Sequence, residues 1–190
     1  MIGRISLALL ALVCAGAPRA AAQAPASPDS TGFLDLDDVT VRMAGGGLRV
    51  DILPMNPEIV SLSTDDLRRF LEEAYRKIPD TVPYDLKQNG TTFLIGFTSS
   101  EKEISFEPSR VALNSEGRQY YPRTIVPISQ GFESKVLTIL SAPVWGVYIF
   151  DPGIDLVSTL EFSYGDLSSS GASWRRVVQA VELARTRAKR

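Results

Sequence analysis

The ionisable side chains available for chemistry in this sequence are mainly carboxylates and amines. The chain has no histidine and a single cysteine, Cys14, which lies inside an apolar N-terminal run. Histidine is the commonest general base and the commonest zinc ligand, and a thiolate nucleophile needs a cysteine. A hydrolase built from this sequence therefore has to rely on pairs of carboxylates.

The clearest candidates for such a pair are Glu103 and Glu107, which alternate along one predicted strand. Positions i and i+4 of a strand lie about 13 Å apart, whereas the two carboxylates of a glycosidase lie about 5 to 9.5 Å apart. We therefore expect these glutamates to lie on a solvated strand face. A carboxylate-based hydrolase acting on an envelope polymer stays open as an alternative, because partners on other strands can lie nearer.

A second set of carboxylates suggests ion binding. Asp37, Asp151 and Asp155 lie in predicted loops, and Ca²⁺ prefers clustered carboxylate and carbonyl oxygens. The spacing does not match an EF-hand, and solvated turn aspartates are the competing interpretation. Calcium is the one cofactor that the sequence suggests, and it would make the chain a calcium-stabilised adhesive module.

The C-terminus is basic, with Arg185, Arg187, Lys189 and Arg190 close together. These cations suit the negative end of a helix dipole, and they could also bind an acidic partner or touch anionic lipid head groups. The whole chain has a formal net charge of −2, so the sequence predicts no nucleic-acid partner.

Residues 1–22 predict a cleaved export signal. Arg4 gives a positive start, Ile5–Ala17 is almost wholly apolar, and Ala20–Ala22 offers small residues for cleavage. An apolar run of 13 residues is shorter than the ~20 that cross a bilayer, which favours a removed signal over an anchor. We expect an exported protein, either periplasmic or extracellular.

Two further features belong to this N-terminal part. Cys14 opens the alternative of lipid attachment, although the residue before it, Val13, is bulkier than such processing prefers. Residues 23–38 are rich in Ala, Pro and Ser at their start and predict a flexible leader. Residues 39–190 then form one predicted domain.

The predicted domain is organised around Thr91–Pro122, which indicates two β-hairpins in succession. In the first, Phe93–Phe97 and Ile104–Phe106 alternate apolar and polar residues, as strands with one solvated face do. In the second, Asn114–Gly117 is the turn. The other predicted strands are 39–43, 48–52, 124–128, 134–141, 144–151 and 160–164. Of these, 134–141 and 144–151 are apolar on both faces, which predicts interior strands.

Two helices are predicted, near 64–78 and near 172–187. The first begins with the acidic residues Asp65 and Asp66, which suit a helix N-terminus, and the second has an apolar stripe that begins at Trp174. Asn89 begins a formal glycosylation sequon, but Asn followed by Gly favours turn formation as its interpretation. The pattern as a whole predicts a mainly β fold, an immunoglobulin-like antiparallel β-sandwich with two flanking helices.

Three stretches resemble a known kind of domain: Val111–Tyr121, Gly146–Pro152 and Thr159–Tyr164. Their order is similar to that of extracellular immunoglobulin-like domains of bacterial exported proteins, of the DUF4352-like kind. The resemblance covers about residues 91–166, and the two charged helices lie outside it. It implies an envelope or secreted domain that binds or has a structural role, and it supplies no catalytic residues.

These observations predict an exported, non-enzymatic binding or structural domain of the cell envelope. Its expected partner is an envelope protein or polymer. The carboxylate-based hydrolase and the calcium-stabilised adhesive module are the two alternatives.

Overall fold

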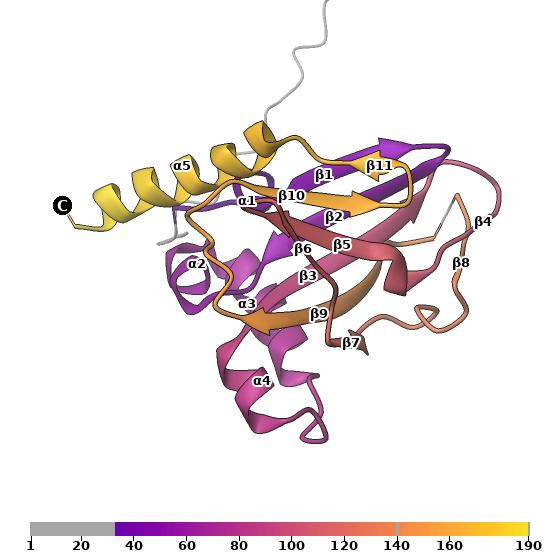
Figure 1. The fold of residues 1–190 in the computed structure, drawn as a ribbon, viewed down its shortest axis with the longest axis horizontal. Coiled ribbons are helices and arrows are strands. Elements are labelled where there is room, and N and C mark those ends of the chain that lie inside the picture. Colours follow the sequence, from indigo (N-terminus) through magenta and orange to yellow (C-terminus); the bar gives the residue numbers. More distant parts are fainter. Residues whose placement is uncertain (1–32, 140, 190) are drawn as a thin grey trace, which may run out of the picture.

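The computed structural model describes residues 33–139 and 141–189 (Figure 1). The predicted export signal, Cys14, most of the predicted leader and Arg190 lie outside these residues. Among the described residues, no helix combines the length and the apolar composition needed to cross a membrane.

The described strands form three antiparallel sheets, so the predicted mainly β class is confirmed. The five-stranded sheet has the order β1 (Val41–Gly45), β2 (Leu48–Pro54), β3 (Gly90–Ser99), β9 (Val144–Pro152) and β7 (Thr124–Pro127). The four-stranded sheet has the order β11 (Leu167–Ser168), β10 (Leu160–Tyr164), β5 (Val111–Ser115) and β6 (Arg118–Tyr120). The short strands β4 (Ile104–Ser105) and β8 (Val136–Leu137) pair separately.

Helices lie around these sheets. They are α1 (Leu36–Val39), α2 (Pro57–Leu62), α3 (Asp65–Arg76), α4 (Tyr84–Asn89), the 3-10 helix η1 (Pro108–Arg110) and α5 (Gly171–Ala188). The two predicted helices are present as α3 and α5. The short helices α1, α2 and α4 have too few turns to give a clear periodic pattern, and the sequence did not predict them.

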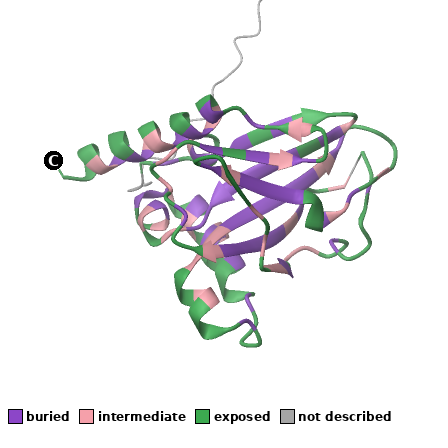
Figure 2. Ribbon diagram, in the orientation of Figure 1, coloured by how far each residue is buried: buried purple, intermediate pink, exposed green. Residues whose placement is uncertain are grey.

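The two larger sheets lie face to face (Figure 1), and aromatic side chains pack between them. The ring of Phe93 on β3 lies 5.1 Å from that of Phe162 on β10 and 6.1 Å from that of Trp174 on α5. Phe97, four residues further along β3, stacks on Phe106 with their ring centroids 4.6 Å apart. These buried rings exclude water from the space between the sheets (Figure 2).

The strand at Phe93–Phe97 has no solvated face, contrary to the sequence prediction. Leu94 and Gly96, on the opposite face from the phenylalanines, are buried as well. That outer face is covered in part by α3, whose Phe70 packs edge-on against Trp145 of β9 at 5.3 Å. The alternation of side chains along β3 therefore separates two buried faces, one with aromatic and one with smaller apolar residues. It does not separate a buried face from a solvated one.

The first predicted hairpin is wrong and the second is confirmed. β3 pairs with β2 and β9, whereas β4 pairs with β8. Long-range partners give β3 two full ladders, which a local hairpin with the two-residue β4 does not offer. β5 and β6 do form the second hairpin, with Glu116 and Gly117 in the left-handed region at its turn.

The interior strand predicted at 134–141 is also wrong. Among the described residues of this range, only Val136 and Leu137 are in a strand. Leu137 is buried, whereas Val136 and Ile139 are 39% and 53% exposed. The strand predicted at 144–151 is confirmed as β9, which is buried on both faces. Composition alone did not distinguish these two apolar runs.

The end of the predicted flexible leader belongs to the fold. Leu34 is 1% exposed, and the N–H of Phe33 donates to the carbonyl of Leu62 at 2.8 Å. Leu34 also forms a parallel bridge with Ser63, directly before α3. Burial of Leu34 and these backbone bonds fix the segment that precedes α1.

Two buried tyrosines of this core provide a matched test of hydrogen bonding. The Tyr148 hydroxyl has no hydrogen-bond partner among the described residues, and burial raises its pKa. We expect Tyr148→Phe to leave the free energy of unfolding unchanged or to raise it by up to about 1 kcal/mol, because no bond is lost. In contrast, the Tyr164 hydroxyl accepts the N–H of Glu107 at 2.8 Å, so Tyr164→Phe should cost about 1 kcal/mol.

Urea unfolding followed by circular dichroism measures both changes. A loss of more than about 1 kcal/mol in Tyr148→Phe contradicts the first expectation, because it requires a bond that the hydroxyl makes in solution.

Candidate functional site

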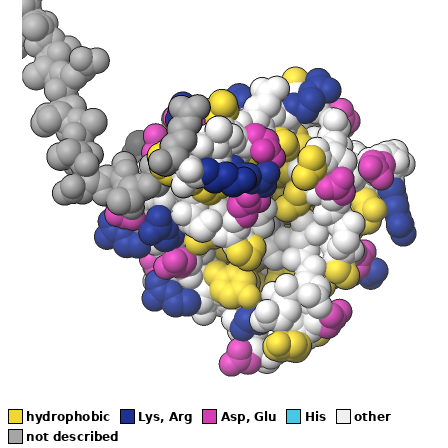
Figure 3. Space-filling view, turned by 90° about the vertical axis from the view of Figure 1, so that its left-hand side faces the viewer, with side chains coloured by type: hydrophobic (Ala, Val, Ile, Leu, Met, Phe, Trp, Pro, Cys, Tyr) yellow, Lys and Arg dark blue, Asp and Glu magenta, His cyan; other side chains and the backbone are white. Residues whose placement is uncertain are grey.

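A groove of about 780 Å³ opens on the surface of the described structure. It lies between α2, α3, α4, the start of β3 and the loop from β9 to β10. Its apolar lining residues are Met55, Pro57, Val60, Leu71, Ile154 and Leu156. Figure 3 looks onto the side of the molecule with α2 and α4, where hydrophobic side chains gather between charged ones. Ligand sites in proteins are commonly about 300 to 1,000 Å³ and mostly apolar.

The groove exists because the chain leaves the sheet at the end of β2. The N–H of Met55 still donates to the carbonyl of Thr92 at 2.9 Å, but the chain then turns into α2. Asn56 caps that helix by accepting the N–H of Ile59 at 2.7 Å, and Pro57 occupies its first turn. These local signals direct α2 away from β3 and open a space beside it.

One edge of β3 faces this space. Gly90 and Thr91 pair with β9 on one side, while β2 on the other side pairs no further than Pro54, opposite Phe93. Residues 90–92 are part of the groove lining and are half-buried. The groove therefore has a short length of strand backbone along one wall.

The ionisable groups in the groove are used mostly inside the protein. Arg68 donates to the carbonyl of Ser63 at 3.0 Å and lies 3.4 Å from Asp65, so it joins α3 to α2. Lys87 donates to the carbonyl of Ile78 at 3.3 Å and to a carboxylate oxygen of Asp80 at 3.1 Å. These contacts hold the helices that form the walls, which leaves an apolar cavity with a positioned polar rim.

Gly90 lets the end of α4 lie close against β9, because a larger residue would not fit there. A Cβ at this position would lie 2.4 Å from the carbonyl oxygen of Leu86 and 3.0 Å from that of Phe150. The φ of Gly90 is −65°, so the requirement is space and not an unusual backbone conformation. Asn89 is the last residue of α4, and not part of the turn that the sequence suggested.

We expect Gly90→Ala to lower the free energy of unfolding by about 1 to 3 kcal/mol, because two of the three atoms nearest to the added Cβ are backbone oxygens, which cannot turn aside. Gly45→Ala is the matched control. Its Cβ would meet only the side chain of Leu167, which can rotate, so its cost should be smaller. Equal costs in urea unfolding would show that the approach of α4 to β9 is not what demands glycine.

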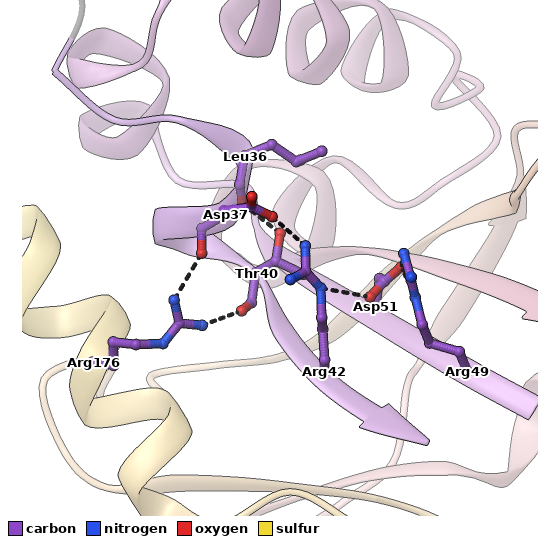
Figure 4. A network of polar contacts seen from close by, with 7 residues as sticks. All are labelled: Leu36, Asp37, Thr40, Arg42, Arg49, Asp51 and Arg176. Atoms are coloured by element: carbon purple, nitrogen blue, oxygen red, sulfur yellow. Dashed lines mark hydrogen bonds and ion pairs between the residues drawn. The ribbon is translucent and has the colours of Figure 1, made fainter. Parts of the chain in front are cut away.

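The second notable feature is a polar network on the hairpin formed by β1 and β2 (Figure 4). Asp51 on β2 is 4% exposed, and its Oδ2 accepts from Nε and Nη2 of Arg49 at 2.9 and 2.6 Å. Nε of Arg42, on β1, lies 3.3 Å from Oδ1 of the same carboxylate. A buried carboxylate costs free energy unless it is paired, and here two guanidinium groups neutralise it.

The same network connects the N-terminal segment to the last helix. Arg42 also donates to the carboxylate of Asp37 in α1, and this contact lowers the pKa of Asp37. Arg176 of α5 donates to the backbone carbonyls of Asp37 and Thr40 at 2.8 and 2.6 Å. α1 is thus held from both sides by arginines.

The three predicted calcium ligands have other partners. Asp37 pairs with Arg42, and Asp151 accepts from Arg123 at 2.7 Å. Asp155 accepts the backbone N–H of Val157 at 2.9 Å, a turn contact. Within residues 33–139 and 141–189, no three Cys, Asp or Glu side chains are grouped so that they could hold a metal ion.

The glutamates considered for catalysis are not on one strand. Glu103 precedes β4 and is exposed, whereas Glu107 precedes η1. Glu107 accepts from Nζ of Lys135 at 2.8 Å and from Ser109 at 3.0 Å, and these bonds lower its pKa. Glu107 therefore connects η1 to the loop before β8.

The basic C-terminal residues divide into two groups. Arg185 donates to Glu58 of α2 and to Glu182 at 2.6 Å each, so it joins α5 to α2. Arg187 and Lys189 are exposed at the end of α5. The sequence did not predict the groove, because its lining combines residues from 55 to 156. It also did not predict a role for Asp51, whose one signal was a charge between the apolar residues Val50 and Ile52.

Comparison of the chain with protein-family models, with curated proteins and with solved structures finds no match in any of the three.

Proposed function

We propose that this chain is an exported, non-enzymatic domain of the cell envelope that binds a segment of another envelope component in the groove beside β3. The observation that carries the proposal is the groove itself. Its volume of about 780 Å³ and its apolar lining suit a ligand, and its arginine and lysine already make internal contacts. This composition supports binding more than proton transfer.

An extended protein segment is the ligand class that we favour. The wall at residues 90–92 is extended strand backbone past the end of β2, and apolar side chains line the space beside it. The carbonyl of Thr92 already accepts the N–H of Met55, and the N–H of Gly90 donates to the carbonyl of Leu86, so the apolar lining would supply most of the contacts. An extended peptide that lies along a strand places alternate side chains in the pockets beside it, and these pockets give specificity.

The finer fold assignment belongs to the same proposal. Two antiparallel sheets with an aromatic core between them support an open sandwich of the immunoglobulin-like kind, as the sequence resemblance implies. Export from the cytoplasm follows from the predicted signal at residues 1–22.

The test is photo-crosslinking in the exporting cell, using the full chain with a photoreactive residue at Ser61, which lines the groove. Ser109, exposed on η1, is the control position. We expect a discrete adduct from Ser61 alone. Val60→Asp should remove it, whereas Val157→Asp, at a residue 74% exposed and outside the groove, should not.

Two results oppose the proposal. The same adduct from Ser109, or an adduct unaffected by Val60→Asp, places the contact elsewhere on the surface. Release of soluble fragments from purified envelope polymer by the protein would show that it is a hydrolase.

A further inference from the structure

The lining of the groove beside β3 contains one charged side chain that has no partner, Glu72 of α3. Glu72 is exposed, and among the described residues its carboxylate makes no hydrogen bond and no ion pair. The two cations of the lining are different, because Arg68 lies 3.4 Å from Asp65 and Lys87 lies 3.1 Å from Asp80. Since each cation has its own carboxylate, Glu72 leaves the groove with one unbalanced negative charge.

Two arginines of α3 have the helical spacing to pair with Glu72, since Arg68 lies four residues before it and Arg76 four residues after it. Arg68 instead uses its guanidinium group on Asp65 and on the carbonyl of Ser63. Arg76 donates to the backbone carbonyl of Glu72 at 3.4 Å and does not line the groove. Neither arginine therefore neutralises the carboxylate of Glu72 by direct contact.

An aromatic ring lies one helical turn from this carboxylate. Tyr75 lines the groove, is 37% exposed, and shares a face of α3 with Glu72 because the two are three residues apart. The Tyr75 hydroxyl donates to the carbonyl of Lys87 at 3.4 Å, which holds the ring against α4. The face of an aromatic ring attracts the cation of a lysine or an arginine. A carboxylate and a fixed ring on one helix face therefore suit a cationic side chain.

The amide of Asn89, at the end of α4, adds a further acceptor to the lining. Its Nδ2 donates to the carboxylate of Asp85 at 2.6 Å, which leaves Oδ1 without a partner among the described residues. The charged donors of the lining, on Arg68 and Lys87, are already used on carbonyls and carboxylates. Gln88 is neutral and can either donate or accept. The open oxygens of the groove therefore suit a ligand that brings hydrogen-bond donors, as an ammonium or a guanidinium group does.

We propose that the protein segment bound in the groove carries a lysine or an arginine next to its apolar residues, and that Glu72 and the ring of Tyr75 bind this cation. The inference rests on the groove binding proposed above and adds the charge of the partner. The apolar side chains of the segment lie against Val60, Leu71 and Leu156. An acidic segment would bring a carboxylate next to Glu72, and this repulsion excludes it.

The probes are short peptides selected from a random display library on the purified exported protein, then synthesised with a fluorescent label. We expect the selected peptides to carry a lysine or an arginine beside an apolar residue. In fluorescence anisotropy at low salt, Glu72→Gln should weaken their binding at least about fivefold. Glu73→Gln is the matched control and should leave binding unchanged, because Glu73 pairs with Lys77 at 3.5 Å and does not line the groove.

A charge exchange and a pair of tyrosine variants separate cation binding from a structural role of α3. A selected peptide whose cation is replaced by glutamate should bind the wild type at least about tenfold more weakly, and Glu72→Lys should restore its binding. Tyr75→Leu should weaken binding of the basic peptide about threefold, whereas Tyr75→Phe keeps the ring and should leave binding unchanged. Damage to the helix would not restore binding of the acidic peptide.

The outcomes that oppose this inference differ from those that oppose groove binding. Selected peptides that lack a cation, and whose binding Val60→Asp abolishes, overturn the preference for a basic segment and leave groove binding in place. An affinity of Glu72→Gln equal to that of the wild type has the same meaning. If no peptide is selected whose binding Val60→Asp abolishes, both proposals are contradicted.

Discussion

Replacing Trp174 with alanine is expected to lower the free energy of unfolding by about 3 to 5 kcal/mol. Trp174 is 1% exposed, and its ring packs against Phe93 and Phe162 at 6.1 and 6.0 Å, so it contacts both large sheets. Its indole N–H also donates to the carbonyl of Leu156 at 3.0 Å. Truncation removes the transfer free energy of a large side chain, leaves a cavity and leaves that carbonyl without its donor.

Urea unfolding followed by circular dichroism measures this loss, and Leu183→Ala is the matched control. Leu183 lies on the same helix but is 60% exposed, so its truncation should change stability by no more than about 0.5 kcal/mol. A loss below about 1 kcal/mol in Trp174→Ala would mean that α5 is not packed against the two sheets in solution.

Asp51→Asn should lower the free energy of unfolding by about 2 to 3 kcal/mol. The substitution keeps the size of the side chain but removes the one buried anion that neutralises Arg42 and Arg49. Breaking a fully buried pair costs about 3 to 5 kcal/mol, and the half-exposed arginines here can turn partly to water, which reduces the cost.

Asp37→Asn is the control, because it removes the other carboxylate that Arg42 contacts. That side chain is 78% exposed, so solvent screens its ion pair and its loss should cost much less than that of Asp51. Salt separates the two further: at about 1 M NaCl the small cost of Asp37→Asn should vanish, while that of buried Asp51→Asn should remain. Equal costs for the two variants would show that burial does not set the strength of this network.

Local sequence patterns predicted an element correctly where its partner is the next element along the chain, or where one of its faces packs on a single surface. The hairpin of β5 and β6 followed from its Asn-to-Gly turn, and the stripe that begins at Trp174 predicted α5. In both cases the signal lies within a few residues, as turn chemistry and helical periodicity do.

Pairing between distant strands could not be read in the same way. β3 has its ladders with β2 and β9, about 40 and 50 residues away along the chain, and the alternation of its side chains is the same for any partner. For this reason the sequence assigned β3 to a local hairpin with a solvated face. The strand is buried on both faces because α3 covers part of its outer side, which no pattern within β3 records.

By itself, the sequence determined the mainly β class, two of the helices and the absence of histidine chemistry, because composition and short-range periodicity are properties of the chain. Only the tertiary structure decided that Asp51 lies between two arginines and that Met55, Leu71 and Ile154 line one groove. Those arrangements depend on which distant surfaces bury each other, and burial is a property of the assembled fold.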